Sequence, residues 1–238
     1  MLNDQRQRWH SLRTMTNAIL SVLWSGVQWR KLDSAYPPWQ SVYYYYRKWK
    51  RSGLFEQLLQ TLVVAERRRQ GRADTPSRLA FDSQSVKIAP FLNQDKGWDG
   101  AKRINGRKRH LGVDSLGLPW GLLVTSAQVS DSAAGCHLAH QVAQRVPDLK
   151  VVLADHGYKQ SFLDHVARQQ PTWRVEIVQK PESAQGFVPQ KGRWQVERSF
   201  GWLNFRRRLS KDFERLVESA QAMLQLAFIS FLLPRLAK

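Results

Sequence analysis

Residues 193–209 read Arg193-Trp-Gln-Val-Glu197-Arg-Ser-Phe-Gly-Trp-Leu-Asn204-Phe-Arg-Arg-Arg208-Leu209, and their apolar members recur at roughly helical spacing. That spacing predicts a helix. Arg193 lies one turn before Glu197 on such a helix. Asn204 and Arg208 follow on later turns. We therefore predict a face on which an acid is flanked by donors suited to phosphate. An ordinary solvated ion pair is the alternative for Glu197 taken alone.

Two further acids, Asp82 and Asp155, stand at the predicted carboxyl ends of strands. Leu79-Ala-Phe81-Asp82 enters one strand, and Lys150-Val-Val-Leu-Ala-Asp155 is a short apolar strand typical of a sheet centre. Ligand sites of α/β sheets form at the carboxyl ends of strands. If the two strands are neighbours, the two acids lie side by side. Each acid alone has an ordinary explanation as a turn residue.

Three carboxylates at one place repel one another and need cations. Hard divalent ions such as Mg²⁺ prefer carboxylate oxygens and keep positions open for water and phosphate. Two ions about 3.5–4 Å apart can serve phosphoryl transfer. The residues therefore predict that Asp82, Asp155 and Glu197 are catalytic and hold two Mg²⁺ ions, with Mn²⁺ able to substitute. Asp114, at a predicted hairpin turn, and Asp131, at a predicted helix start, have sufficient local explanations.

The composition indicates a polyanionic partner. The 238 residues carry a net charge of +18, with an estimated pI of 10.6, which points to nucleic acid. The single cysteine, Cys136, excludes an internal disulfide and fits a reducing compartment. No signal-peptide pattern opens the sequence, and the apolar run 222–233 is shorter than the roughly 20 residues that span a bilayer. We expect a soluble cytoplasmic protein.

Three helices are predicted at the N-terminus, over 12–24, 39–51 and 54–69, with Gly and Pro at their joints. They suit a helix-turn-helix-like module. The polar, charged segment 66–76 is the predicted boundary. The domains are expected to be a helical DNA-binding domain over 1–75 and a catalytic domain over 76–238.

The second helix, 39–51, mixes aromatic residues with cations and is the predicted DNA-reading helix. Its cations are Arg47, Lys48, Lys50 and Arg51. A helix cannot expose every aromatic residue, so about half of Tyr43–Tyr46 and Trp49 must belong to the core. Simple core packing is the alternative for all of these aromatic residues.

The remaining sequence alternates strands and helices. Strands are predicted over 79–82 (with a continuation through Val86 and Ile88 left open), 108–114, 120–125, 150–155 and 173–178. Helices are predicted over 131–146, 160–169, 193–209 and 216–236. Loops are expected over 89–107 and 180–192. This mixed α/β order is what a ribonuclease H-like sheet flanked by helices would show.

Several segments resemble, in order, those of a DDE transposase of the insertion sequence 5 family. They are Gly26-Val-Gln-Trp29-Arg, Pro37-Pro-Trp39, Phe81-Asp82-Ser-Gln-Ser-Val-Lys87, Gly106-Arg-Lys-Arg-His110-Leu-Gly-Val-Asp114-Ser-Leu-Gly117, Leu153-Ala-Asp155-His-Gly-Tyr158 and Arg193-Trp-Gln-Val-Glu197-Arg-Ser-Phe-Gly-Trp-Leu-Asn204. The resemblance implies a ribonuclease H-like fold, divalent metal, and cutting and joining of transposon-end DNA. The family often has Tyr and Lys where this chain has Gln190 and Asn204.

Other candidate DNA contacts are cations and polar residues near these segments. They are Arg193, Asn204, Trp98, Lys102, Arg103, Lys108, Arg109, His156, Arg207, Arg208 and Lys211. Trp98 could stack on an unpaired base or fold onto its own domain. Cys136, His137 and His140 fall inside one predicted helix without a fourth ligand nearby, so chance spacing explains them better than zinc does.

The sequence thus predicts a bacterial, nucleoid-associated DNA transposase whose partner is double-stranded DNA, both transposon ends and target. We expect it to act as a homodimer or larger assembly, because two ends must be joined. A structure-selective nuclease of the same fold and a catalytically inactive, transposase-derived DNA-binding protein are the alternatives.

Overall fold

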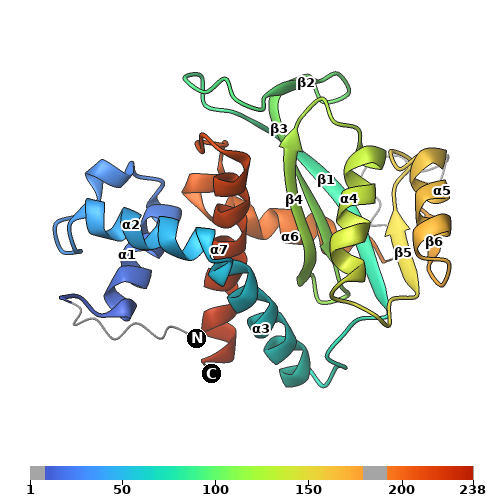
Figure 1. Ribbon diagram of the computed structural model, residues 1–238, viewed down its shortest axis with the longest axis horizontal. Helices are drawn as coiled ribbons and strands as arrows, with labels where there is room; N and C mark the ends of the chain where they lie inside the picture. Colours follow the sequence, from blue (N-terminus) through green and yellow to red (C-terminus); the bar gives the residue numbers. More distant parts are fainter. Residues whose placement is uncertain (1–8, 179–191, 238) are drawn as a thin grey trace.

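The computed structural model describes residues 9–178 and 192–237 of the chain. Within them, one mixed sheet has helices on both faces (Figure 1). The strands are β1 (Arg78–Lys87), β2 (Gly97–Asp99), β3 (Ile104–Val113), β4 (Pro119–Ser126), β5 (Val151–Ala154) and β6 (Arg174–Ile177). The helices are α1 (Leu12–Ser25), α2 (Trp39–Arg51), α3 (Leu54–Arg69), α4 (Asp131–Ala143), α5 (Gln160–Gln169), α6 (Trp194–Asn204) and α7 (Val217–Leu236), with the 3₁₀ turns η1 (Trp29–Lys31) and η2 (Arg207–Leu209).

The sheet has β1 at its centre. β1 pairs antiparallel with β3 on one side and parallel with β5 on the other, and β6 continues the parallel part. β4 pairs with the other edge of β3, which confirms the predicted hairpin. The predicted order of strands and helices is confirmed, with β2 as an addition inside the expected loop 89–107.

β1 is longer than the predicted strand 79–82. Its second half, from Asp82 to Lys87, pairs with β3, although its sequence lacks an apolar alternation. Asp82 therefore lies in the middle of β1 and does not end it. The parallel partner β5 is the strand that ends at this level, after Ala154. Beyond this level β5 no longer accompanies β1, and the next parallel contact in the described part of the chain is an isolated bridge between Ile88 and Asp212.

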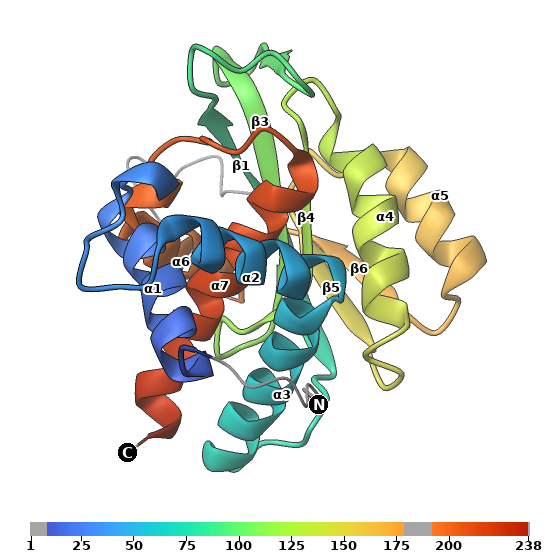
Figure 2. The ribbon, with the colours of Figure 1, turned by 60° about the vertical axis from the view of Figure 1, so that its left-hand side comes forward.

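Helices cover both faces of the sheet (Figure 1, Figure 2). α4 and α5 lie on one side, and α6 and α7 lie on the other. α3 and α1 pack against α7, so one buried apolar cluster runs from the N-terminal helices into the sheet. The three N-terminal helices are confirmed where they were predicted. Their division from the rest at residue 75 stays a prediction, and the expected boundary segment 66–76 begins inside α3, where Glu66 and Arg67 are buried.

α7 is the one helix in the described part of the chain that is long and apolar enough to cross a membrane. The expectation of a span that is too short considered only the run 222–233, whereas the helix has 20 residues. Most of α7 is buried inside the protein, against α3, α1, α6 and β4. That burial is typical of a core helix, so its apolar character is weak evidence for a membrane.

The predicted helix 193–209 is wrong at its C-terminal end. α6 ends at Asn204, and Arg206 has extended dihedral angles before the short turn η2 begins. η2 packs against the end of α1, where a Cβ on Gly26 would lie 3.2 Å from the backbone of Arg207. Gly26 also has a φ of 73°, so glycine serves both the turn and the close approach. Arg208 is therefore not on the same helical face as Glu197.

Candidate active site

The strand register brings Asp82 and Asp155 together. Leu79 pairs with Val152 and Ala80 pairs with Leu153 in the parallel ladder of β1 and β5. The same offset, continued by two residues, sets Asp82 beside Asp155, directly after β5 ends. The sequence prediction that these two acids lie side by side is consistent with this register.

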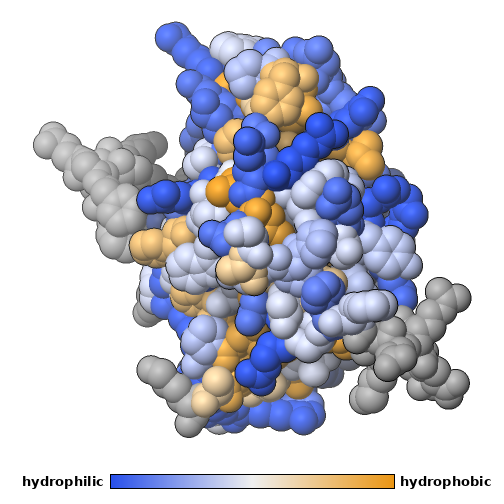
Figure 3. Space-filling model, turned by 90° about the vertical axis from the view of Figure 1, so that its left-hand side faces the viewer, coloured by the Kyte–Doolittle hydropathy of each residue, from blue (hydrophilic) through white to orange (hydrophobic). Residues whose placement is uncertain are grey.

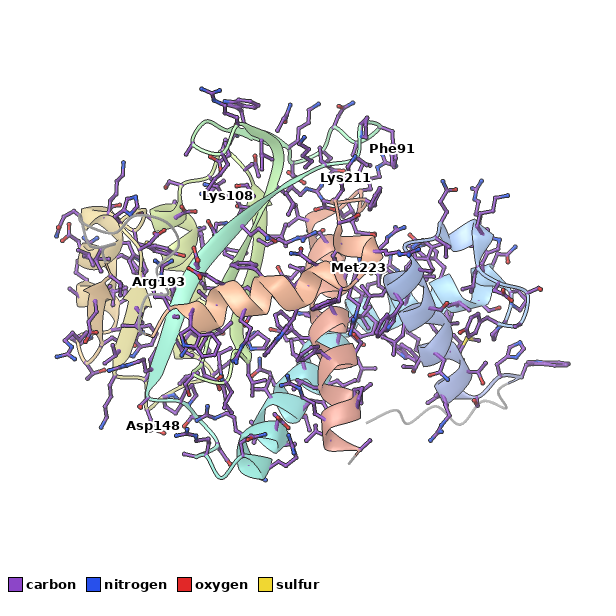
Figure 4. All side chains as sticks on the ribbon, turned by 180° about the vertical axis from the view of Figure 1, so that it is seen from behind. Phe91, Lys108, Asp148, Arg193, Lys211 and Met223 are labelled. Carbon is purple, nitrogen blue, oxygen red and sulfur yellow. The ribbon has the colours of Figure 1, made fainter. Side chains whose placement is uncertain are left out.

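Arg193 joins the two acids. Its Nη2 lies 3.1 Å from Oδ2 of Asp82 and 3.9 Å from Oδ2 of Asp155. The Arg193 side chain is 7% exposed, and Figure 4 shows it where α6 begins, beside β1. Helical spacing predicts Arg193 as a DNA contact on the same side of the helix as Glu197. In the structure its guanidinium reaches the carboxylates of Asp82 and Asp155, and contact with DNA stays a prediction.

Contacts with the hairpin of β3 and β4 fix α6, and with it Arg193. The Ser199 hydroxyl donates to the carbonyl of Gly117 at 2.8 Å, and Arg198 donates to the carbonyl of Leu116 at 2.9 Å. Gly117 has a φ of 78°, and a Cβ there would lie 2.8 Å from the Ser199 hydroxyl. The hairpin turn therefore needs glycine for α6 to approach this closely.

The Asp82 carboxyl is only 17% exposed, and its environment opposes ionisation. Burial raises the pKa of Asp82 to about 6, and the charges of Asp155 and Asp131 add to the rise. Arg193 and the backbone N–H of Ser83 lower this pKa without overcoming burial. Burial, more than the neighbouring carboxylates, therefore opposes the ionisation of Asp82.

Asp131 belongs to the same neighbourhood, which the sequence analysis missed. Its Oδ1 accepts from the Ser83 hydroxyl at 2.7 Å and lies 3.4 Å from Nζ of Lys108. A Cβ on Gly157 would lie 2.9 Å from Oδ1 of Asp155 and 3.1 Å from Oδ2 of Asp131. Ser130, not Asp131, caps α4 by accepting from a backbone N–H. The available signal was this serine, which left Asp131 free for another role.

The Tyr158 hydroxyl lies buried near these acids. Tyr158 is 2% exposed, and its hydroxyl makes no hydrogen bond within the described part of the chain. Burial, with the charges of Asp82, Asp131 and Asp155, raises its pKa well above the ordinary value. A buried hydroxyl without a partner is costly, so this region suits a group that can accept its hydrogen bond.

Glu197 is exposed in the first turn of α6. Among residues 9–178 and 192–237, no three Asp, Glu, His or Cys side chains are placed to hold a metal ion together. The structure thus brings two of the three predicted acids to one place but does not gather all three into a ready ligand set. Gln190, together with the predicted loop 180–192 apart from Gly192, lies outside the described residues.

The candidate DNA contacts fall into two groups. The exposed group comprises Arg47, Lys48, Arg51, Trp98 at 57% exposure, Lys102, Arg103, His156, Asn204, Arg207 and Lys211. The other group, which is buried or half-buried, comprises Lys50, Lys108, Arg109, Arg193 and Arg208. Trp98 lies on β2, not on a loop.

The inward cations tie elements together. Lys50 donates to the Ser219 hydroxyl at 2.9 Å, and Arg109 donates to the carbonyl of Leu209 at 2.9 Å. Arg208 pairs with Glu214 at 2.7 Å. Burial lowers the pKa of Arg109 to about 10, as expected for a cation taken out of water. In this structure the three side chains serve contacts within the fold, and their contact with DNA stays a prediction.

The structure places His165 near the group formed by Cys136, His137 and His140. Cys136, His137 and His140 on α4 line a pocket with His165 on α5. In the described part of the chain their geometry does not form a metal-holding group. The expectation that this spacing is not a zinc site therefore stays a prediction.

Comparison with known proteins adds a family to this geometry. Residues 73–233, which include β1, β5 and α6, match the family model described as "Transposase DDE domain". The chain belongs to the DDE transposases. Residues 2–59 match a second family model, "Putative transposase of IS4/5 family", which confirms the resemblance to that group. A DDE domain implies a ribonuclease H-like fold, in agreement with the sheet order.

A curated relative supports the same family. It is the "Putative transposase for insertion sequence element IS402" of Burkholderia cepacia, 30% identical over 128 residues. The match covers 51% of this DDE transposase and 60% of the relative. The chain thus spans about three fifths of the length of that relative.

DDE transposases generally use divalent metal ions such as Mg²⁺. The donors in this chain fit such an ion. Asp82 and Asp155 are neighbouring carboxylates, and among the described ion pairs Arg193 is the cation that reaches both of them. Carboxylate oxygens are the ligands that Mg²⁺ prefers.

Proposed function

We propose that this DDE transposase binds the ends of an insertion sequence and catalyses metal-dependent DNA strand cleavage and strand transfer. The observation that carries the proposal is the pairing of Asp82 with Asp155 across the parallel register of β1 and β5, inside a DDE domain. The net charge of +18 supports DNA as the substrate.

Asp82, Asp155 and Glu197 are the proposed ligands of two Mg²⁺ ions, for which Mn²⁺ can substitute. When bound, the ions supply Lewis-acid stabilisation of charge on the scissile phosphate. Asp82 and Asp155 are anchored by the sheet, whereas Glu197 comes from α6 and completes the set. Water first attacks a phosphodiester at the transposon end and releases a 3′-hydroxyl. This 3′-hydroxyl then attacks a target phosphodiester, so that a new bond to the transposon end replaces the bond to the departing 3′-hydroxyl of the target strand.

Exposed cations on α2 are the proposed surface for double-stranded DNA. Trp39, Tyr43, Arg47, Lys48 and Arg51 line part of an open groove of about 730 Å³ along α2. Figure 3 shows the face over the N-terminal helices, where apolar residues are scattered among hydrophilic ones. Aromatic faces and guanidinium groups together suit the bases and phosphates of DNA.

Trp98, Lys102 and Arg103 form a second proposed contact surface near the tip of β2 and β3. Asp99 supports their turn by accepting from the backbone N–H groups of Ala101 and Lys102, at 3.0 and 3.1 Å. The other exposed candidates near the active site are His156, Asn204, Arg207 and Lys211. Contact with both surfaces would give DNA binding a steep salt dependence.

Three coarser features belong to the same proposal. The helices before residue 76 act as the DNA-binding part, and residues 76–238 act as the catalytic part. The protein works as a homodimer or larger assembly, since two ends must be held in one complex. Its place in the cell is the cytoplasm, on the nucleoid.

The test is incubation of the full chain with DNA that carries the ends of the parent element, in Mn²⁺ or in EDTA. The proposal expects cleaved ends and strand-transfer products in Mn²⁺ alone. Cleavage without joining would identify a nuclease of the same fold. A mobility shift without any cleavage would identify a DNA-binding protein without catalysis.

A further inference from the structure

Arg193 occupies the position of a cation between the two acids. Its guanidinium is buried and lies nearest to Asp82, with Asp155 at 3.9 Å. Nothing else among the described ion pairs of the chain reaches either carboxylate. The strand register sets the two partly exposed carboxylates side by side, where they repel each other, and this positive charge offsets the repulsion.

Arg193 lies at the start of α6, whereas the two acids belong to the sheet. Arg193 is the residue immediately before α6, while both acids are on β1 and after β5. Lys108, the other cation nearby, is committed to Asp131 at 3.4 Å and Asp99 at 3.7 Å. The charge balance of the two acids therefore depends on the start of α6.

We infer that Arg193 is a positioning residue that holds Asp82 and Asp155 together until divalent ions bind, and that the ions displace its guanidinium. The inference rests on the proposed function, because it needs these acids to be the metal ligands. A guanidinium and a divalent ion cannot both occupy the space between the two carboxylates, so they compete.

Displacement also gives Arg193 a second use. Its paired donors suit a phosphate, and the residue lies one helical turn from Glu197. Once released from the acids, the guanidinium is available to the DNA strand at the site. The side chain would then have two states. It is buried against the acids when no ion is bound, and it contacts DNA, as the sequence predicts, once ions have displaced it.

The test measures Mn²⁺ binding to the full chain without DNA, by calorimetry and by the electron paramagnetic resonance signal of free Mn²⁺ at pH 7.5. Arg193→Gln removes the charge at similar size. Its Mn²⁺ dissociation constant should fall by about tenfold or more, because a competing unit charge about 4 Å away is withdrawn. Its melting temperature without metal should drop, and the rise in melting temperature on adding Mn²⁺ should exceed that of the wild type.

Two variants serve as controls. Arg193→Lys keeps the charge, so its dissociation constant should stay within about threefold of the wild type. Arg198→Gln removes a guanidinium from the same helix that contacts Leu116 and the ring of Trp194 instead of the acids. It should lower the melting temperature and leave Mn²⁺ binding unchanged.

The outcomes separate this inference from the proposed function. Mn²⁺ binding that is lost in Asp155→Asn but unchanged or weaker in Arg193→Gln would overturn the inference alone. Equal binding by the wild type and Asp155→Asn would remove the metal site on which both rest. If Arg193→Gln folds only when Mn²⁺ is present, the ion has taken over the role of the guanidinium, as the inference requires.

Discussion

Two buried acid–arginine pairs in this sheet have opposite surroundings. Asp114, directly after β3, lies 2.5 Å from Nη1 of Arg67 and also accepts from the backbone N–H groups of Leu116 and Leu118 and from the indole of Trp120. Asp82, in the middle of β1, accepts from one backbone N–H and shares Arg193 with Asp155.

The difference separates a pair that stabilises the fold from the pair for which we propose a catalytic role. The carboxylate of Asp114 has four donors, so its charge is stabilised within the fold. Asp82 faces two other carboxylates, and its pKa is raised to about 6. Buried acids with raised pKa values are costly to stability and are typical of functional sites. We therefore expect that neutralising Asp114 lowers the stability of the fold and that neutralising Asp82 raises it.

The largest effect is expected from Asp114→Ala. It leaves Arg67 buried without its charged partner, which should lower the free energy of unfolding by about 3–5 kcal/mol. Urea denaturation followed by circular dichroism measures this change. A role at the hairpin turn, as predicted from the sequence, would not explain so large an effect. The effect arises because the pair of Asp114 and Arg67 joins α3 to the hairpin of β3 and β4. A loss below about 1 kcal/mol would remove the contrast between the pairs.

Asp82→Asn should act in the opposite direction. The raised pKa means that, between about pH 4 and pH 6, the folded protein holds a proton that the unfolded chain has released. Stability should therefore fall as the pH rises through this window, and above it the ionised Asp82 should cost up to about 3 kcal/mol. Asp82→Asn removes that cost, so the variant should melt higher than the wild type at pH 8.

Thermal melts of wild type and Asp82→Asn from pH 4 to pH 8, without metal, measure the effect. The difference between the two curves should shrink as the pH falls from 6 towards 4, because Asp82 of the folded wild type becomes protonated and no longer carries the cost of ionisation. Asp114→Asn provides the matched control, because it should lower the melting temperature at every pH. A variant Asp82→Asn that is less stable than wild type at pH 8 would show that the acid is stabilised by its surroundings.

The smallest effect concerns the surface. Arg47 is exposed and lies over the ring of Tyr43, in the groove along α2. Arg47→Gln should reduce the slope of log K against log salt for end-bearing duplex DNA by about one unit. Arg68→Gln is the control, since Arg68 on α3 is also exposed but pairs with Asp74 and lies outside the groove. Equal slopes for both variants would exclude this groove as the DNA surface.

Much of the fold follows from local patterns in the sequence. α2, α3 and α5 begin and end at the predicted residues, because proline, glycine and helical apolar spacing mark them. β2 and the second half of β1 carry no such pattern. They exist because β3 provides a partner for their backbone groups, which is a tertiary cause.

The candidate site likewise has some features that the sequence predicts and others that it does not. Asp82 and Asp155 could be found because acids that follow apolar strand segments meet at one edge of a sheet. The inward turn of Arg193 could not be found, since helical spacing gives its neighbours on α6 and not the strand on which α6 packs. Asp131 was passed over because a residue at a helix start has a sufficient local explanation, until Ser130 is seen to provide the cap.

The central claim is that Asp82 and Asp155, which share Arg193, perform the chemistry, and that Asp114, whose carboxylate has four donors, does not. Its most direct test is the rate of Mn²⁺-dependent cleavage of end-bearing DNA by Asp155→Asn and Asp114→Asn, each scaled to the folded fraction and to the amount of bound DNA. The account predicts cleavage at background level for Asp155→Asn and close to the wild-type rate for folded Asp114→Asn. Wild-type cleavage by Asp155→Asn would contradict it.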